Sequence, residues 1–215
     1  MISFDMEQTS DEWFDVRRGV PTSSCFNRIM TSKGMKLAAG ATSYMHQLIA
    51  EAARKGEPAD ESFSTPAIEH GVKTEPEAAD YYAAFCTSEP VYEIGFTKTD
   101  DGRFGGSPDR MVGDDGVLEI KCPQPVTHVG WLDRGGIPDK HLAQVHGHMI
   151  TTGRDWCDWL SYCPPFPELL VRAVADDYTA RLMEVLDEFH LAFEKMKAKA
   201  CFSELLTTIT NSARL

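Results

Sequence analysis

The chain has 215 residues, with 33 acidic and 21 basic side chains and a formal net charge of −12. Hydrophobic residues make up 42% and charged residues 25%, a composition that is typical of a globular protein and excludes a wholly disordered or collagen-like one. No apolar run reaches the roughly 18 residues of a membrane-spanning helix, so we expect no membrane partner.

The first third of the chain is predicted to be mainly helical. Apolar residues at helical spacing indicate one helix over residues 13–20, ended by glycine and proline. Hydroxyl residues at 22–24 and at 42–43 can each cap the first turn of a further helix. A longer helix opens at Thr65-Pro66, and we expect a kink or a break in it at Pro76.

The middle of the chain is predicted to form strands. Three strands are expected, over residues 91–96, 104–113 and 117–122. Asp115-Gly116 indicates a two-residue hairpin turn between the second and the third strand. Next come a helix, two more strands and an amphipathic helix, at residues 138–153, 155–163, 169–175 and 176–199.

This order of elements predicts one α/β (α+β) domain with a short mixed central sheet flanked by helices. The domain is expected to span residues 1–215. Its parts are a helical region over about 1–88, a sheet-centred core over about 89–175 and a C-terminal helix over about 176–200.

The charge is unevenly distributed along the chain. Residues 16–55 hold seven basic side chains and one acidic one, a local balance of +6, whereas residues 56–96 hold nine acidic side chains and one basic one, a balance of −8. Whole-chain acidity argues against a nucleic-acid partner, but the fields that matter for binding are local. Two interpretations stay open: ordinary fluctuation of surface charge, or a basic region that binds phosphate.

The most informative stretch runs from Asp109 to Lys121. Two strands joined by a tight hairpin bring Asp109 and Glu119 side by side, and strand alternation puts Glu119 and Lys121 on one face, with Ile120 turned into the core. Two neighbouring carboxylates repel unless a cation neutralises them, and oxygen ligands select Mg²⁺ or Mn²⁺. Glu75 offers a third carboxylate. The alternative is a solvated strand face with no function.

Five short motifs in order are similar to those of the lambda exonuclease-like (YqaJ viral recombinase) family, within the PD-(D/E)XK nuclease superfamily. The resemblance extends from about residue 13 to the C-terminal helix. It rests on WFDVRRGVPTSS (13–24), HGVKTEPEA (70–78), GSPD (106–109), LEIKCP (118–123) and AQV (143–145).

The resemblance implies a restriction-endonuclease-like core and a set of site residues. Asp109 and Glu119 match the metal ligands of the family, together with the backbone carbonyl of Ile120 and the helical acid Glu75. Lys121 matches the catalytic lysine. Gln144 matches a glutamine beside the active site, and a pocket for the 5′-phosphate of a DNA end is implied at Arg17, Ser24, Ser107 and Lys121.

The resemblance also implies a function and partners. The expected protein is a 5′-to-3′ exonuclease that uses one or two Mg²⁺ ions, for which Mn²⁺ can substitute, and digests one strand of duplex DNA. A homotrimeric ring, a single-strand annealing protein as partner in DNA recombination and a phage or prophage origin are implied as well. Two alternatives stay open: another PD-(D/E)XK nuclease, such as a structure-specific or RecB-like endonuclease, and a non-catalytic protein that binds DNA ends.

The N-terminus, the histidines and the cysteines complete the prediction. The acidic first residues lack the layout of a signal peptide, so we expect a cytoplasmic protein, and the resemblance implies a bacterial host cell. His141 and His148 share one helix face with Gln144, where ordinary structural roles are favoured over a metal site or an outlook into the active site. The six cysteines lack clustered spacing, which predicts free thiols and argues against an iron–sulfur cluster.

Overall fold

The structure is a computed structural model that describes residues 1–57 and 65–212, without the side chains of residues 67, 68 and 201–212. In chain order its elements are β1 (Ile2–Phe4), α1 (Asp11–Arg17), the 3-10 helix η1 (Ser23–Arg28), α2 (Ala41–Ala53), α3 (Pro66–Phe85), β2 (Val91–Tyr92), β3 (Phe96–Lys98), β4 (Gly105–Gly106), β5 (Arg110–Val112), β6 (Gly116–Lys121), α4 (Pro125–Arg134), α5 (Asp139–Thr152), β7 (Trp156–Ser161), β8 (Leu169–Val174) and α6 (Asp177–Ser212).

The strands form two sheets. The larger has the order β2-β5-β6-β7-β8, in which β6 and β7 run parallel and the other neighbours antiparallel. Parallel strands need a long crossover, and the chain supplies it as α4 and α5 between β6 and β7. The smaller sheet is antiparallel, with the order β1-β3-β4. The predicted mixed α/β class is therefore confirmed.

Helices cover both faces of the larger sheet around β6. On one face α3 packs over Leu118 and Ile120 of β6, and on the other α5 packs over Val117. Because side chains alternate along a strand, Glu119 belongs to the face that α5 covers, and it is only 1% exposed. A solvated strand face is therefore excluded for Glu119.

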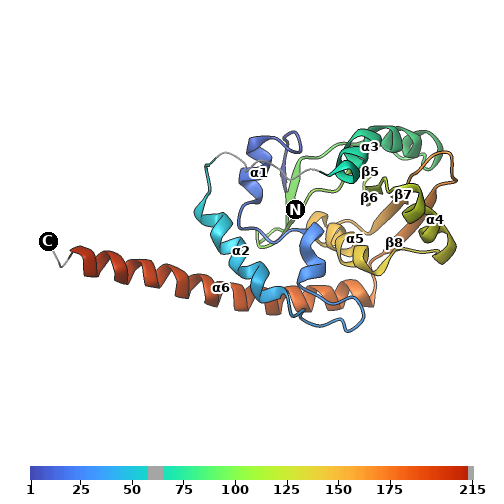
Figure 1. Cartoon of the computed structure of the whole chain (residues 1–215). Coiled ribbons are helices and arrows are strands. Elements are labelled where there is room, and N and C mark those ends of the chain that lie inside the picture. Colours follow the sequence, from blue (N-terminus) through green and yellow to red (C-terminus); the bar gives the residue numbers. More distant parts are fainter. Residues whose placement is uncertain (58–64, 213–215) are drawn as a thin grey trace.

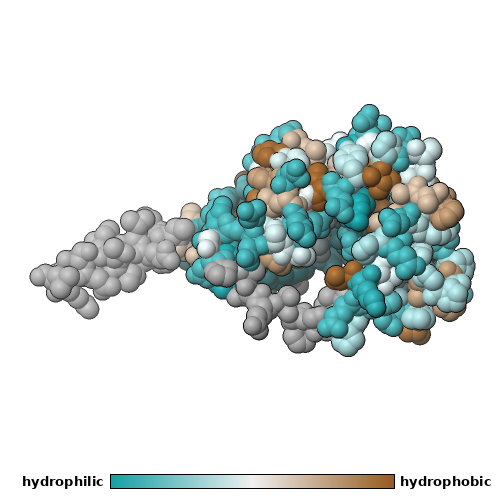
Figure 2. Space-filling model, turned by 90° about the horizontal axis from the view of Figure 1, so that it is seen from above, coloured by the Kyte–Doolittle hydropathy of each residue, from teal (hydrophilic) through white to brown (hydrophobic). Residues whose placement is uncertain are grey.

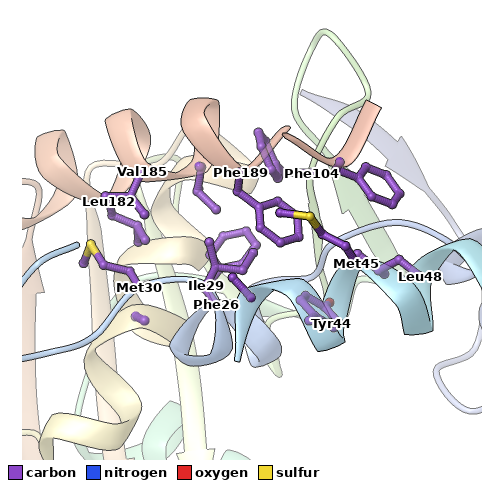
Figure 3. Packing of buried hydrophobic residues seen from close by; sticks show 14 residues of the cluster. Phe26, Ile29, Met30, Tyr44, Met45, Leu48, Phe104, Leu182, Val185 and Phe189 are labelled. Carbon is purple, nitrogen blue, oxygen red and sulfur yellow. The ribbon is translucent and has the colours of Figure 1, made fainter. Parts of the chain in front are cut away.

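A second hydrophobic core lies behind α5. It joins η1 and α2 to the first part of α6, with Phe26, Tyr44 and Phe189 among its largest side chains (Figure 3). The second half of α6 extends away from the rest of the chain, whereas α2 lies beside its first half (Figure 1). This core fixes η1 against α5, which matters for the site described below.

The surface of the described residues shows no membrane-spanning feature of the helical kind. None of their helices is both long and apolar enough to cross a bilayer. On the face drawn in Figure 2 the hydrophobic residues are scattered among hydrophilic ones.

The prediction of free thiols is confirmed for the five cysteines whose side chains are described, and Cys201 lies outside these.

Two predicted strands are each divided between the sheets. Residues 91–96 separate into β2 and β3, because Gly95 approaches the chain of β1 so closely that an added Cβ would lie 2.7 Å from the carbonyl oxygen of Phe4. Residues 104–113 separate into β4 and β5. Pro108 lies at that break and has no N–H to donate to a neighbouring strand.

Turns and helix ends also differ in detail from the predictions. Val112 pairs with Gly116, so the hairpin turn has three residues, with Gly113 at φ +53, and not two. The first turn of α2 has Gly40 as its N-cap and no side-chain cap, so residues 42–43 lie inside the helix. Of the kink or break predicted at Pro76, the break is wrong, since α3 continues through this residue. Two elements, β1 and α4, were not predicted from the sequence.

Candidate active site and phosphate pocket

The hairpin of β5 and β6 brings Asp109, Glu119 and Lys121 together. The backbone N–H of Asp109 donates to the carbonyl of Leu118 at 3.1 Å, and the N–H of Ile120 donates to Asp109 Oδ2 at 2.5 Å. Asp109 is thereby fixed across β6 beside Glu119. Lys121 Nζ forms an ion pair with Glu119 Oε1, so the three predicted residues form one connected group.

The second oxygen of Glu119 contacts a residue of α5. His148 Nε2 lies 2.8 Å from Glu119 Oε2, and both side chains are almost fully buried. The other ring nitrogen, Nδ1, lies 3.2 Å from the hydroxyl of Ser23 at the start of η1. His148 is therefore a buried residue with hydrogen-bond partners at both ring nitrogens, as a structural role predicts, and one of these partners is the candidate metal ligand.

The pKa values of Asp109 and Glu119 shift in opposite directions. Burial, and then the charges of Glu119 and Glu75, raise the pKa of Asp109 well above its usual range. Burial acts on Glu119 as well, but the charge of Lys121 and the hydrogen bond of His148 outweigh it and lower the pKa of Glu119 to about 2. Glu119 is thus ionised at neutral pH, whereas ionisation of Asp109 leaves a negative charge without sufficient compensation.

Lys121 and Glu75 adjoin this group at the mouth of a cleft. Burial lowers the pKa of Lys121, but the charges of Glu119 and Asp109 outweigh it, so the net shift is upward and the ammonium stays charged. Burial raises the pKa of Glu75, and Arg110 partly offsets this rise. Glu75 and Lys121 line a cleft of about 560 Å³, whose walls include Ile120, Trp131 and His141.

These residues fit a hard divalent cation by the chemistry of their donors. Asp109, Glu119 and Glu75 offer carboxylate oxygens, and the pKa of Asp109 is raised partly by the other two, so a cation would relieve their repulsion. Within the described part of the chain, no three His, Cys, Asp or Glu side chains converge as closely as metal ligands do. Glu119 in particular is already engaged by Lys121 and His148.

Arg17 and Ser107 form the second part of the site. Arg17 Nη1 donates to Ser107 Oγ at 3.2 Å, and the guanidinium lies 3.9 Å above the ring of Trp13. Trp13 Nε1 also donates to Ser107, at 2.9 Å, and to the carbonyl of Gly95. Burial lowers the pKa of Arg17 to about 10, so it remains charged at neutral pH.

Among the described residues, no carboxylate lies within ion-pairing distance of Arg17. Its sequence neighbour Arg18 forms the ion pair with Asp15, at 3.3 Å. An ordinary surface ion pair with Asp15 is therefore excluded for Arg17. A planar guanidinium that is oriented by an aromatic ring and unpaired is suited to bind a phosphate group.

Ser24 and Gln144 lie near the two groups without joining them directly. The chain at Thr22 bridges to Gly105 of β4, which brings the start of η1 beside the strand that leads to Ser107. Ser24 is exposed, and its hydroxyl lies 3.2 Å from that of Thr22. Gln144 is half-buried on α5, one helical turn before His148 and therefore on the same helix face.

Sequence reasoning missed three residues of this site. The sequence predicts helix capping for Ser23, helix packing for Trp13 and a structural role for His148. Trp13 contacts Ser107 and His148 contacts Glu119, whereas Ser23 reaches Glu119 through His148. The spacing of His148 from Gln144 was the one available signal. His141, on the same face, contacts the rings of both Trp131 and Trp159.

This chain has a mixed sheet, with Asp109 before β5 and with Glu119 and Lys121 at the end of β6. This arrangement is that of the PD-(D/E)XK nucleases. The sequence profile of the YqaJ-like viral recombinase domain matches residues 12–155. The chain belongs to this family.

Solved structures of exonucleases resemble the chain. The alkaline exonuclease LHK-Exo of Laribacter hongkongensis is 31% identical, with a TM-score of 0.71 over 89% of this chain and 98% of that one. Its complex with dAMP gives 32% identity, a TM-score of 0.72 and the same coverage. A phage-related exonuclease of Haemophilus somnus shares the fold, with 12% identity and a TM-score of 0.61 over 84% and 96% of the two chains. No curated protein sequence matches significantly. Family and neighbours support a DNA exonuclease.

Proposed function

We propose that the chain is a Mg²⁺-dependent exonuclease that digests one strand of duplex DNA from its 5′ end and leaves 3′ single-stranded overhangs for recombination by strand annealing. The observation that carries the proposal is the buried group of Asp109, Glu119 and Lys121 at the β5–β6 hairpin, where Glu119 and Glu75 raise the pKa of Asp109, so ionised carboxylates would repel one another there. Such a group costs free energy unless it binds a cation. This argument supports metal dependence in particular.

Each residue has a role in the proposed reaction. Asp109, Glu119, Glu75 and the carbonyl of Ile120 would hold one or two Mg²⁺ ions, which supply an activated water and stabilise charge on the scissile phosphate. Lys121 stays protonated, so it stabilises phosphoryl charge or orients the water and does not act as a base. Gln144, one helical turn before His148 on α5, would lie beside this group.

The polarity of digestion is assigned to the phosphate pocket. Arg17 and Ser107, with Ser24 and Lys121, would bind the terminal 5′-phosphate and so orient the end of the strand. Arg17 is the principal contact, because its fork of donors is charged and oriented by Trp13. Double-stranded DNA ends, a homotrimeric assembly, a single-strand annealing partner and a place in the cytoplasm of a bacterial host complete the proposal.

Digestion of linear duplex labelled separately at each end of one strand tests this function. With Mg²⁺ we expect the 5′ label to leave first, as mononucleotide, and the 3′ label to be retained until late. EDTA is expected to stop the reaction, and Mn²⁺ to restore it.

Two further substrates separate the alternatives. A covalently closed plasmid is expected to survive, and rapid nicking of it would favour a structure-specific or RecB-like endonuclease. Retarded migration of linear duplex without any digestion, under the same metal conditions, would favour a non-catalytic protein that binds DNA ends.

A further inference from the structure

We infer that His148 is a positioning residue that orients Glu119 for metal binding, as the middle of a buried hydrogen-bond chain that begins at Ser23. The inference rests on the proposed function, because it assigns Glu119 a metal ion to bind. Glu119 lies in the larger sheet, His148 on α5 and Ser23 at the start of η1, so three separate elements determine where one carboxylate points.

The hydrogen bond between His148 and Glu119 has a defined direction. A carboxylate oxygen only accepts, so His148 Nε2 donates to Glu119 Oε2 over 2.8 Å. The other ring nitrogen, Nδ1, lies 3.2 Å from the hydroxyl of Ser23, which can donate or accept, so this bond forms whichever of the two atoms carries the proton. Ser23 and His148 are each 1% exposed, so water does not compete for these bonds.

Two glycines allow the hydrogen-bond chain from Ser23 to Glu119 to form. An added Cβ on Gly147 would lie 3.0 Å from the Cβ of Ser23, so this glycine lets η1 approach α5 closely. An added Cβ on Gly106 would lie 2.9 Å from Ser23 Oγ and 3.3 Å from His148 Nδ1. The position of His148 is thus fixed by backbone packing on two sides, as expected of a group that orients another.

The two partners of Glu119 differ in their freedom to move. Lys121 is 27% exposed at its side chain and reaches Oε1 on a flexible stem, so it can release the carboxylate when a cation or a phosphate arrives. His148 has no such freedom at 1% exposure. It therefore keeps Oε2 in place while Oε1 changes partner, and the rotamer of Glu119 is preserved.

Free Mn²⁺, measured by its electron paramagnetic resonance signal during titration of the metal-free chain, provides a readout that does not depend on DNA digestion. We expect His148→Ala to weaken Mn²⁺ binding about 10- to 100-fold. His148→Gln is expected to recover much of this loss, because its amide can donate to Oε2. Ser23→Ala is expected to weaken binding less, about two- to tenfold.

His146→Ala is the matched control. His146 lies two residues away on α5 and is also buried, but its ring contacts Thr179 of α6 and not the site. We expect its Mn²⁺ affinity to equal that of the unaltered chain. On linear duplex, His148→Ala is expected to lower kcat with little change in KM, because the DNA contacts remain.

Several outcomes would overturn the inference. They are an unchanged Mn²⁺ affinity in folded His148→Ala, an equal loss in His146→Ala, and no recovery in His148→Gln. If His148→Ala does not fold, His148→Gln and Ser23→Ala decide the question by the same titration. A chain that binds Mn²⁺ but digests no DNA would refute the proposed function alone, and the titrations would still test the role of His148.

Discussion

Replacing Arg17 by alanine is expected to remove the preference of the enzyme for 5′-phosphorylated ends. A hydrogen bond to a charged group contributes about 1.5–3 kcal/mol, so losing one such bond to the terminal phosphate lowers kcat/KM about 10- to 150-fold. The same change leaves Ser107 with a donor, because Trp13 Nε1 lies 2.9 Å from its hydroxyl. The loss should therefore come from the phosphate and not from a collapsed pocket.

The assay compares initial rates on two duplexes that differ only in a 5′-phosphate or a 5′-hydroxyl, so that each variant serves as its own control. Arg17→Ala is expected to lower the rate on phosphorylated ends and to leave the rate on hydroxyl ends nearly unchanged. Arg17→Lys should give an intermediate ratio, since it keeps the charge but loses the planar fork. An equal loss on both kinds of end would refute the assignment of Arg17 to the terminal phosphate.

Three other changes test the remaining parts of the site. Lys121→Ala is expected to lower kcat about 10²- to 10³-fold with Mg²⁺ while the folded circular dichroism spectrum is kept, because a charge that stabilises the transition state is lost; wild-type digestion would contradict this role. The pKa of Asp109 is raised in the folded chain, so its ionisation costs stability as pH rises above about 4. Without metal, the melting temperature of the original chain should fall relative to that of Asp109→Asn as pH rises from there. Melting temperatures that change with pH in the same way in both proteins would contradict this. Gly106→Ala is expected to cost about 1–3 kcal/mol in denaturant unfolding, since its Cβ would lie 2.5 Å from Thr151 Oγ1, whereas Gly130→Ala, which meets nothing within 4 Å, should cost no stability.

Local patterns predicted the elements whose signals are contained in a few neighbouring residues. Alternation along residues 117–122 placed Ile120 in the core and Glu119 on the opposite face, and both placements agree with the structure. The same reasoning failed for residues 104–113, because the division of this stretch between two sheets depends on which distant strand each half pairs with. Pairing partners are not encoded in the alternation of one strand.

The candidate site divides in the same way. The neighbourhood of Asp109 and Glu119 follows from one hairpin, which Asp115-Gly116 predicted although the turn is one residue longer than expected. The contact between His148 and Glu119 joins residues 29 positions apart, and the one between Arg17 and Ser107 joins residues 90 apart. Such contacts result from how helices pack on the sheet, which a single sequence does not specify locally.

The net charge of a segment does not show how much of that charge can bind DNA, because some of its side chains already have ion-pair partners. The balance of +6 over residues 16–55 overstates the charge available to DNA, because Arg18 pairs with Asp15 and Arg54 pairs with Glu57 at 2.8 Å. Arg17, in contrast, is half-buried against Trp13 without a carboxylate partner among the described residues. A partly desolvated cation without a counter-ion is stabilised when an anion binds it, so one oriented arginine is stronger support for a phosphate ligand than the surplus of basic residues around it.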